Sequence, residues 1–156
     1  MTNIRTYPIV PADFVEVIEL GRDMHQENVY RQFDFSPVKC AALLHACVTN
    51  PTTHFARIAV TDADEIIGIL LGEISEHYFG TDLIASDYLW YVAPAHRGSK
   101  AGLMLLNEFQ EWAKARDAVE VYMGISSGLH AAKTGALLEK LGYDLVGGNY
   151  KLRVVV

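Results

Sequence analysis

The stretch that decides the fold runs from Leu89 to Gly102 and reads LWYVAPAHRGSKAG. Its first half is aromatic and β-branched, which is typical of a β-strand. Pro94 ends that strand because proline has no N–H to donate to a neighbouring strand. After a short loop with glycines, residues that can pack on one helix face recur at the spacing i, i+3, i+4, i+7 and i+11. These residues are Gly102, Leu105, Leu106, Phe109 and Ala113. The sequence therefore predicts a strand, a glycine-bearing turn and a helix in direct succession.

A turn of this kind before a helix N-terminus forms an anion site. The first N–H groups of the helix have no partner within the helix, and the helix dipole favours negative charge there. Arg97 and Lys100 add side-chain cations, so we expect the loop to hold a phosphate. Neither the Walker A pattern nor the dinucleotide pattern Gly-x-Gly-x-x-Gly occurs in the chain. The alternative is that the turn simply connects a strand to a helix.

Length and composition indicate one soluble domain over residues 1–156. The chain is 51% hydrophobic and 21% charged, which is ordinary for a globular protein. A net charge of −6 and the lack of a basic tract argue against a nucleic-acid partner. The N-terminus lacks the apolar segment of a signal peptide, and no apolar run is long enough to cross a membrane. We expect a cytoplasmic protein without a membrane partner.

The two cysteines, Cys40 and Cys47, fall in a helical pattern seven residues apart. Seven residues of helix rise about 10.5 Å, which is too far for a disulfide. Both are expected as buried thiols on one helix face, in keeping with a reducing compartment.

Apolar periodicity and turn residues predict six strands and four helices along the chain. Ser36 and Pro37 begin the second helix, and Gly142 ends the last. The predicted strands cover 4–10, 55–60, 66–76, 84–92, 119–123 and 150–155, and the predicted helices 11–28, 37–50, 102–113 and 131–141.

Two motifs carry a resemblance to a known family. Val92-x-Pro94 followed by Arg97, Gly98 and Gly102 resembles motif A of the GCN5-related N-acetyltransferases (GNAT), although Lys100 stands where the middle glycine is usual. About forty residues later, LEKLGY at 138–143 resembles the family's Tyr-Glu-Lys-Leu-Gly-Phe. The resemblance implies the GNAT fold, an α/β (α+β) architecture whose mixed central sheet of six to seven strands is flanked by about four helices.

The resemblance also implies a function. A family member of this kind moves an acetyl group from acetyl-CoA to a primary amine of a small molecule or protein, by direct attack in a ternary complex. Leu138 and Ala131 replace side chains that the family uses, a tyrosine and an asparagine. A non-catalytic acyl-CoA-binding or sensing module is therefore the alternative, and acyl transfer to a non-amine acceptor is a third reading.

The resemblance assigns donor-binding residues in three groups. The backbones of Trp90 and Val92 would pair with pantetheine like an added strand, and an N–H near Tyr91 or Val92 would polarise the thioester. Thr134 belongs to the helix that lines the CoA tail in this family. The pyrophosphate would be bound by the loop residues Arg97, Gly98, Ser99, Lys100, Ala101 and Gly102.

The chemistry further needs a group that takes the amine proton and, where the thiolate is protonated, an acid. Glu73 and Asp87 are the candidate bases by analogy with the fold, although each could be an ordinary polar strand residue. With Leu138 in the tyrosine position, Tyr122 is the candidate acid, with Tyr88 and Tyr150 as alternatives. The expected acceptor contacts are His25, Glu27, Tyr30, His77 and Tyr78.

Two further expectations concern a metal and a partner. The remaining histidines show no ligand spacing, so no metal site is expected. The apolar tail 152–156 could form the edge of a homodimer or could simply complete the core.

Overall fold

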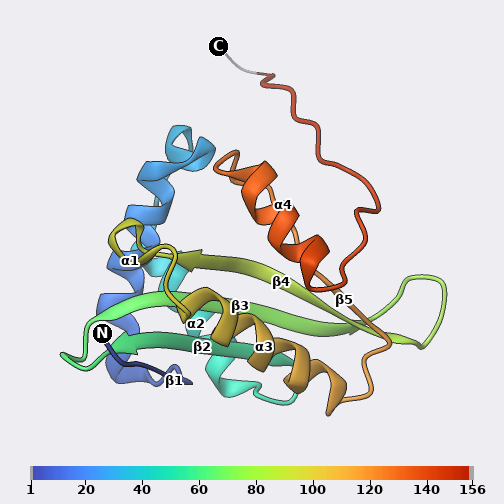
Figure 1. The fold of residues 1–156 in the computed structure, drawn as a ribbon, viewed down its shortest axis with the longest axis horizontal. Helices are drawn as coiled ribbons and strands as arrows, with labels where there is room; N and C mark the ends of the chain where they lie inside the picture. Colours follow the sequence, from blue (N-terminus) through green and yellow to red (C-terminus); the bar gives the residue numbers. More distant parts are fainter. Residues whose placement is uncertain (1, 155–156) are drawn as a thin grey trace.

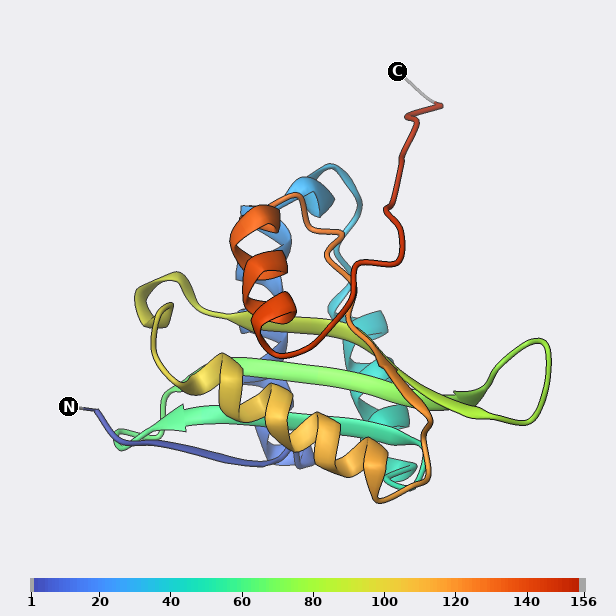
Figure 2. The ribbon, with the colours of Figure 1, turned by 45° about the vertical axis from the view of Figure 1, so that its right-hand side comes forward.

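The computed structural model describes residues 2–154, which form one mixed sheet with helices on both faces (Figures 1 and 2). Five strands lie in the order β1-β2-β3-β4-β5, antiparallel except for the parallel pair β4–β5. The strands are β1 (Ile4–Pro8), β2 (His54–Thr61), β3 (Ile66–Glu76), β4 (Leu83–Val92) and β5 (Glu120–Tyr122). The helices are α1 (Phe14–Glu27), α2 (Pro37–Thr49), α3 (Ala101–Lys114) and α4 (Ala131–Lys140), with 3₁₀ turns at Pro11–Asp13, Val29–Gln32 and Pro94–His96.

The predicted helices and the first five strands are confirmed, with ends that differ by a few residues. Ser36 accepts a hydrogen bond from the Lys39 N–H at 3.3 Å at the start of α2, as expected of an N-cap. Gly142 follows α4 with a φ of 91°, a left-handed conformation that favours glycine. Cys40 and Cys47 are both free, and only Cys47 is fully buried.

The predicted count of six to seven strands is wrong for the described residues, which form five. Residues 143–154, which include most of the predicted last strand, have no strand structure and lead away from the sheet (Figures 1 and 2). Strand structure requires a neighbour that satisfies the backbone groups, and no described strand pairs with this segment. Position 155 of that predicted strand lies outside the described residues.

Each face of the sheet has its own apolar core. On one face, Phe55, Leu70 and Ala85 pack against Leu105 and Phe109 of α3. On the other, strand residues such as Ile58, Ile69 and Leu71 pack against α1 and α2 (Figure 2). None of the helices within residues 2–154 is long and apolar enough to span a membrane.

A β-bulge in β4 interrupts the regular alternation between these two faces. Leu71 pairs with Leu89 while the next residue, Gly72, pairs with Asp87, so Tyr88 is the extra residue on β4. Gly72 also allows α3 to approach closely. A Cβ there would lie 2.7 Å from Phe109 Cε2 and 2.8 Å from the Ser86 carbonyl oxygen.

We expect Gly72→Ala to lower the free energy of unfolding by about 1–3 kcal/mol, because the added methyl group overpacks the core against Phe109. Chemical denaturation followed by far-UV circular dichroism measures the change. Gly80→Ala is the matched control, since nothing lies within 4 Å of a Cβ at Gly80. Equal stability of the two variants would contradict the close contact between β3 and α3.

Candidate functional site

The site begins where β4 and β5 separate. They pair only from Ile84 with Glu120 to Ser86 with Tyr122, and β4 then continues without β5 as far as Val92. The Ala93 N–H donates to the Ile67 carbonyl of β3 at 2.8 Å. Because backbone groups alternate along a strand, those of Trp90 and Val92 point away from β3. This stretch of β4 therefore presents an unpaired backbone edge.

A cavity of about 960 Å³ follows this edge. Its walls come from β4, from the loop that leads into α3, from α1 and the 3₁₀ turn after it, from residues 124–130, and from α4. Trp90 and Gly102 show how tightly two of these walls meet, since Trp90 Nε1 donates to the Gly102 carbonyl at 3.1 Å. A Cβ at Gly102 would lie 3.3 Å from Val92 Cγ2, so glycine allows α3 to begin close to β4.

The loop that leads into α3 has the backbone geometry of an anion site. Gly98 adopts a φ of 87°, which favours glycine, and Ser99 Oγ accepts from the Ala101 N–H at 3.3 Å. Lys100 has a φ of −74°, so the lysine in place of the family's usual glycine needs no unfavourable backbone conformation. The first N–H groups of α3 follow directly.

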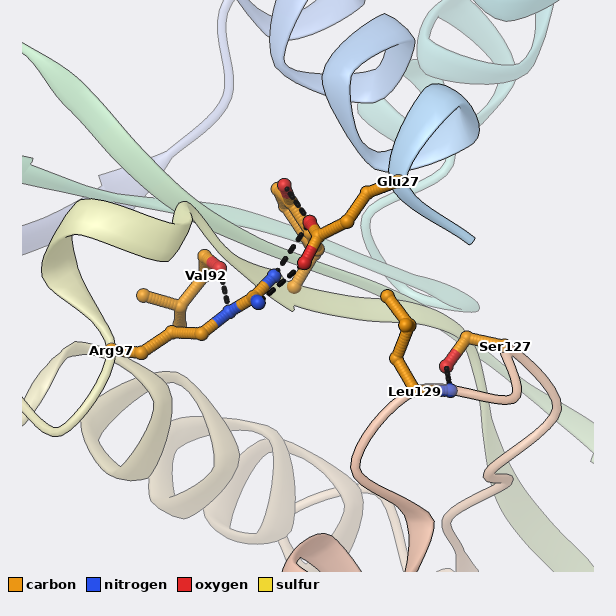
Figure 3. A network of polar contacts seen from close by, with 6 residues as sticks. Glu27, Val92, Arg97, Ser127 and Leu129 are labelled. Atoms are coloured by element: carbon orange, nitrogen blue, oxygen red, sulfur yellow. Dashed lines mark hydrogen bonds and ion pairs between the residues drawn. The ribbon is translucent and has the colours of Figure 1, made fainter. Parts of the chain in front are cut away.

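Arg97 does not extend from this loop as a free cation, in contrast to the expectation that its charge would serve a phosphate. Its guanidinium forms two contacts with the Glu27 carboxylate at the end of α1, the one from Nη2 at 2.7 Å (Figure 3). Arg97 Nε donates to the Val92 carbonyl at 3.1 Å, and the Tyr91 hydroxyl donates to Glu27 at 2.7 Å. The arginine charge is thus used inside the protein.

Electrostatics stabilises this network. The hydrogen bond from Arg97 is the main cause that lowers the pKa of Glu27. Burial, followed by the hydrogen bond to Glu27, raises the pKa of Tyr91. Both charged side chains are only partly exposed, at 30% for Arg97 and 23% for Glu27. The network ties the end of α1 to β4 and to the loop before α3.

Three lysines contribute to the cavity wall: Lys100 before α3, and Lys133 and Lys140 on α4. Unlike Arg97, none of them forms an ion pair within residues 2–154. The two on α4 were not among the residues predicted from the sequence. Their spacing of seven residues, which places both on one side of a helix, is the signal that would have found them.

The segment after α1 bridges the cavity to the loop after β5. The Val29 N–H donates to the Ser127 carbonyl at 3.2 Å, and the Tyr30 hydroxyl is hydrogen-bonded to Ser126 Oγ. Ser127 belongs to this loop, and its Oγ accepts from the Leu129 N–H at 3.3 Å (Figure 3). Asn28 is 3% exposed, and its Oδ1 accepts from the Tyr30 N–H at 2.8 Å. Asn28, Ser126 and Ser127 were not predicted from the sequence, because tertiary contacts alone bring them to the cavity.

The structure separates the expected acceptor contacts into three groups. Tyr30 lines the cavity, and Glu27 is held by Arg97. His25 does not line the cavity. Its Nε2 donates to the Phe33 carbonyl at 3.0 Å. His77 and Tyr78 belong to the turn between β3 and β4, where their rings stack 4.3 Å apart, and they do not line the cavity either.

The three catalytic candidates also differ in position. Asp87 lines the cavity and accepts from the Gly124 N–H at 2.8 Å, while burial raises its pKa. Glu73 lies outside the cavity wall and accepts from the Tyr88 hydroxyl at 2.5 Å. Tyr122 does not line the cavity, and its hydroxyl donates to Glu120 at 2.6 Å. Thr134, expected along the CoA tail, does line it.

Leu138 is 6% exposed and provides no acid. Within residues 2–154, no group of three or more histidine, cysteine, aspartate or glutamate side chains could hold a metal ion.

We expect Glu27→Ala and Arg97→Ala to be coupled by about 1–3 kcal/mol in a double-mutant cycle of unfolding free energies, because either change alone leaves a partly buried charge without its partner. The same cycle on the exposed pair Arg5–Asp64, 53% and 81% exposed, is the control and should give a smaller coupling. Equal coupling would contradict the structural role of the Arg97 network.

The same network predicts a pH dependence. The folded-state pKa of Glu27 is lowered, so its contribution to stability is present above the unfolded value of about 4.3. It is lost as the pH falls through the lower folded-state pKa. Denaturation at several acid pH values should show this loss in the wild type and not in Glu27→Ala.

Comparisons with known proteins agree with this geometry. A family model described as the Acetyltransferase (GNAT) family matches residues 16–143. Glucosamine-6-phosphate N-acetyltransferase from Arabidopsis thaliana superposes with a TM-score of 0.77 at 12% identity, with 98% of this chain and 99% of that one covered. A search of curated protein sequences found no match.

Two aminoglycoside 6'-N-acetyltransferase structures also share the fold. AAC(6')-Ih from Acinetobacter baumannii gives a TM-score of 0.73 at 17% identity, with 99% of each chain covered. AAC(6')-Iy, solved with the bisubstrate analogue CoA-S-monomethyl-acetylneamine, gives 0.74 at 13% identity, again with 99% of each chain covered. These likenesses show the fold, and the family model, which matches most of the sequence, shows that this chain belongs to the GNAT acetyltransferase family.

Proposed function

We propose that this protein is an N-acetyltransferase that moves an acetyl group from acetyl-CoA to a primary amine of a small molecule or protein. The amine would attack directly while both substrates are bound. The observation that carries the proposal is the unpaired edge of β4, which ends at the anion-binding loop and opens into a cavity of about 960 Å³. An extended acyl donor with an anionic end matches this combination of edge and loop.

The pantetheine arm would add to β4 as a strand does. Trp90 offers both its N–H and its carbonyl. Val92 offers its N–H alone, because Arg97 Nε already occupies the Val92 carbonyl. The backbone of Tyr91 points to β3 by alternation. Of the two residues named for polarising the thioester, Val92 therefore has the available N–H.

The pyrophosphate would lie at the start of α3. The Ser99 and Ala101 N–H groups already donate within the loop, to the His96 carbonyl and to Ser99 Oγ. The N–H groups of Gly98, Lys100 and Gly102, together with the helix dipole, would therefore favour an anion there. With Arg97 engaged by Glu27, the side-chain charge would come from Lys100, with Lys133 and Lys140 across the cavity.

Protonation of the departing CoA thiolate would not require an acidic side chain of the protein. Leu138 cannot donate a proton, and the Tyr122 hydroxyl already donates to Glu120. A thiol with a pKa of about 8.5 is nevertheless a tolerable leaving group near neutral pH. Three structures that share this fold are named for acetyl transfer to amino sugars or aminoglycosides, which supports a small amine as the acceptor.

We expect acetyl-CoA to bind in isothermal titration, and Lys100→Glu combined with Lys133→Glu to weaken binding by about tenfold or more, since two cations beside the phosphates become anions. Lys39→Glu, an equal change of charge per residue at an exposed position of α2, is the control and should bind as the wild type does.

A turnover assay, read together with this titration, separates the transferase from the non-catalytic module. Release of CoA thiol is followed with a panel of kanamycin, glucosamine 6-phosphate and a lysine-containing peptide. Turnover with a panel amine supports the transferase, whereas binding without turnover by any of them favours the non-catalytic module. No binding at millimolar acetyl-CoA would contradict both.

We also propose a homodimer formed through the C-terminal tail. Leu145, Leu152 and Val154 are each more than 80% exposed, a pattern that a second chain could cover. After Asp144 the tail carries only the cations Lys151 and Arg153, whereas the whole chain has a net charge of −6. A second copy therefore offers an acidic surface to a cationic, apolar segment.

Analytical ultracentrifugation should show a dimer in the wild type and a monomer in Leu152→Asp combined with Val154→Asp, because carboxylates would be buried in the interface. The control is Asn149→Asp, which adds a carboxylate to the same tail at a polar position. A monomeric wild type would contradict this part of the proposal.

A further inference from the structure

The bulge in β4 gives Tyr88 a position that a regular strand would not. Leu89 and Tyr91 belong to the face of α1 and α2, while Trp90 and Val92 pack toward α3. On the other side of the bulge, Asp87 pairs with Gly72, whose missing side chain faces Phe109 of α3. Tyr88 is the unpaired residue between these two registers, and it lines the cavity.

The Tyr88 hydroxyl is hydrogen-bonded to a carboxylate. It donates to Glu73 Oε2 at 2.5 Å, and Glu73 itself does not line the cavity. The Tyr88 ring stacks on His54, 6.2 Å between centroids, and His54 is the register partner of Glu73 on β2. Tyr88 therefore stands between the cavity and Glu73.

The same surroundings define how the hydroxyl can act. Burial and the bond to Glu73 raise the pKa of Tyr88, so it is a neutral donor at physiological pH. The groups that face the pair are His54 on β2 and Cys47 on α2, with Asp87 adjacent on β4. Within the described residues, no cation forms an ion pair with Glu73, which leaves it as the proton acceptor of this pair.

We propose that the Tyr88 hydroxyl relays the proton of the acceptor amine to Glu73. This inference rests on the proposed acetyl transfer and names the two residues that would make the amine nucleophilic. Asp87, although it lines the cavity, is held by the Gly124 N–H and lies on the α3 side of the bulge. The relay would instead act on the face of the sheet that α1 and α2 cover.

The relay balances as follows. The ammonium gives one proton to the Tyr88 oxygen while the Tyr88 proton moves to Glu73 Oε2. The nitrogen lone pair then forms a bond to the thioester carbon. When the carbon–sulfur bond breaks, its electron pair leaves with the sulfur, which takes the second proton from the former amine. Glu73 is partly exposed and returns its proton to water.

The test compares Tyr88→Phe, Glu73→Gln and the double variant, with the panel amine that the wild type acetylates fastest. Each single variant should lower kcat by about 10²-fold at neutral pH, the scale of one general-base step. The double variant should be no slower than the slower single one, because the two groups act as a unit. Binding of acetyl-CoA should be unchanged in all three.

The pH dependence distinguishes a relay from a structural role. The decrease in kcat caused by Tyr88→Phe should become smaller as the pH rises to the pKa of the amine, because the acceptor is then already neutral. Tyr7→Phe, a tyrosine on β1 outside the cavity wall, is the control and should retain kcat.

Three results would overturn the relay: wild-type kcat in Tyr88→Phe, a loss independent of pH, or additive losses in the double variant. Failure of the wild type to turn over any amine would instead overturn the proposed function, and the relay with it.

Discussion

The separation of β4 from β5 after Ser86 is the constraint on which the rest of the structure depends. A β-strand with free N–H and carbonyl groups on one side is normally covered or paired. Here β5 ends at Tyr122, while β4 continues to Val92 beside a cavity. The walls of that cavity come from segments that lie far apart in the sequence: β4, the loop before α3, the end of α1 and the turn after it, residues 124–130, and α4.

The Arg97–Glu27 network fixes α1 beside the free edge of β4. Two partly buried charges bind one another, and the same guanidinium occupies the Val92 carbonyl. A partly buried ion pair costs desolvation and is favourable only when its geometry and hydrogen bonds are complete, and here Tyr91 supplies a further bond. The arginine thus fixes the position of α1 relative to the strand, and in the proposed function the side-chain charge for a phosphate comes from lysines.

The bulge at Tyr88 gives the two faces of the sheet different roles. Toward α3, Trp90, Val92 and Gly102 form a closely packed wall beside the anion-binding loop. Toward α1 and α2, Tyr88 connects the cavity with Glu73. One extra residue in one strand therefore separates the wall that Trp90 and Val92 form from the Tyr88–Glu73 pair, and both border the same cavity through β4.

The sequence by itself determined the four helices, the first five strands and the family resemblance, because these depend on local patterns. Helical spacing from Gly102 to Ala113, the stop at Pro94 and the glycine after α4 each specify backbone conformation within a few residues. The turn between β4 and α3 was predictable for the same reason, since it consists of consecutive residues.

Only the tertiary structure decided which side chains meet. Glu27 and Arg97 lie 70 positions apart, and Tyr30 and Ser126 lie 96 apart, so no local pattern could pair them. It also decided that residues 143–154 do not form the predicted last strand, because strand structure depends on a neighbour and not on propensity alone. Likewise, His77 and Tyr78 resembled acceptor contacts by order along the chain, yet the fold places them in a turn outside the cavity wall.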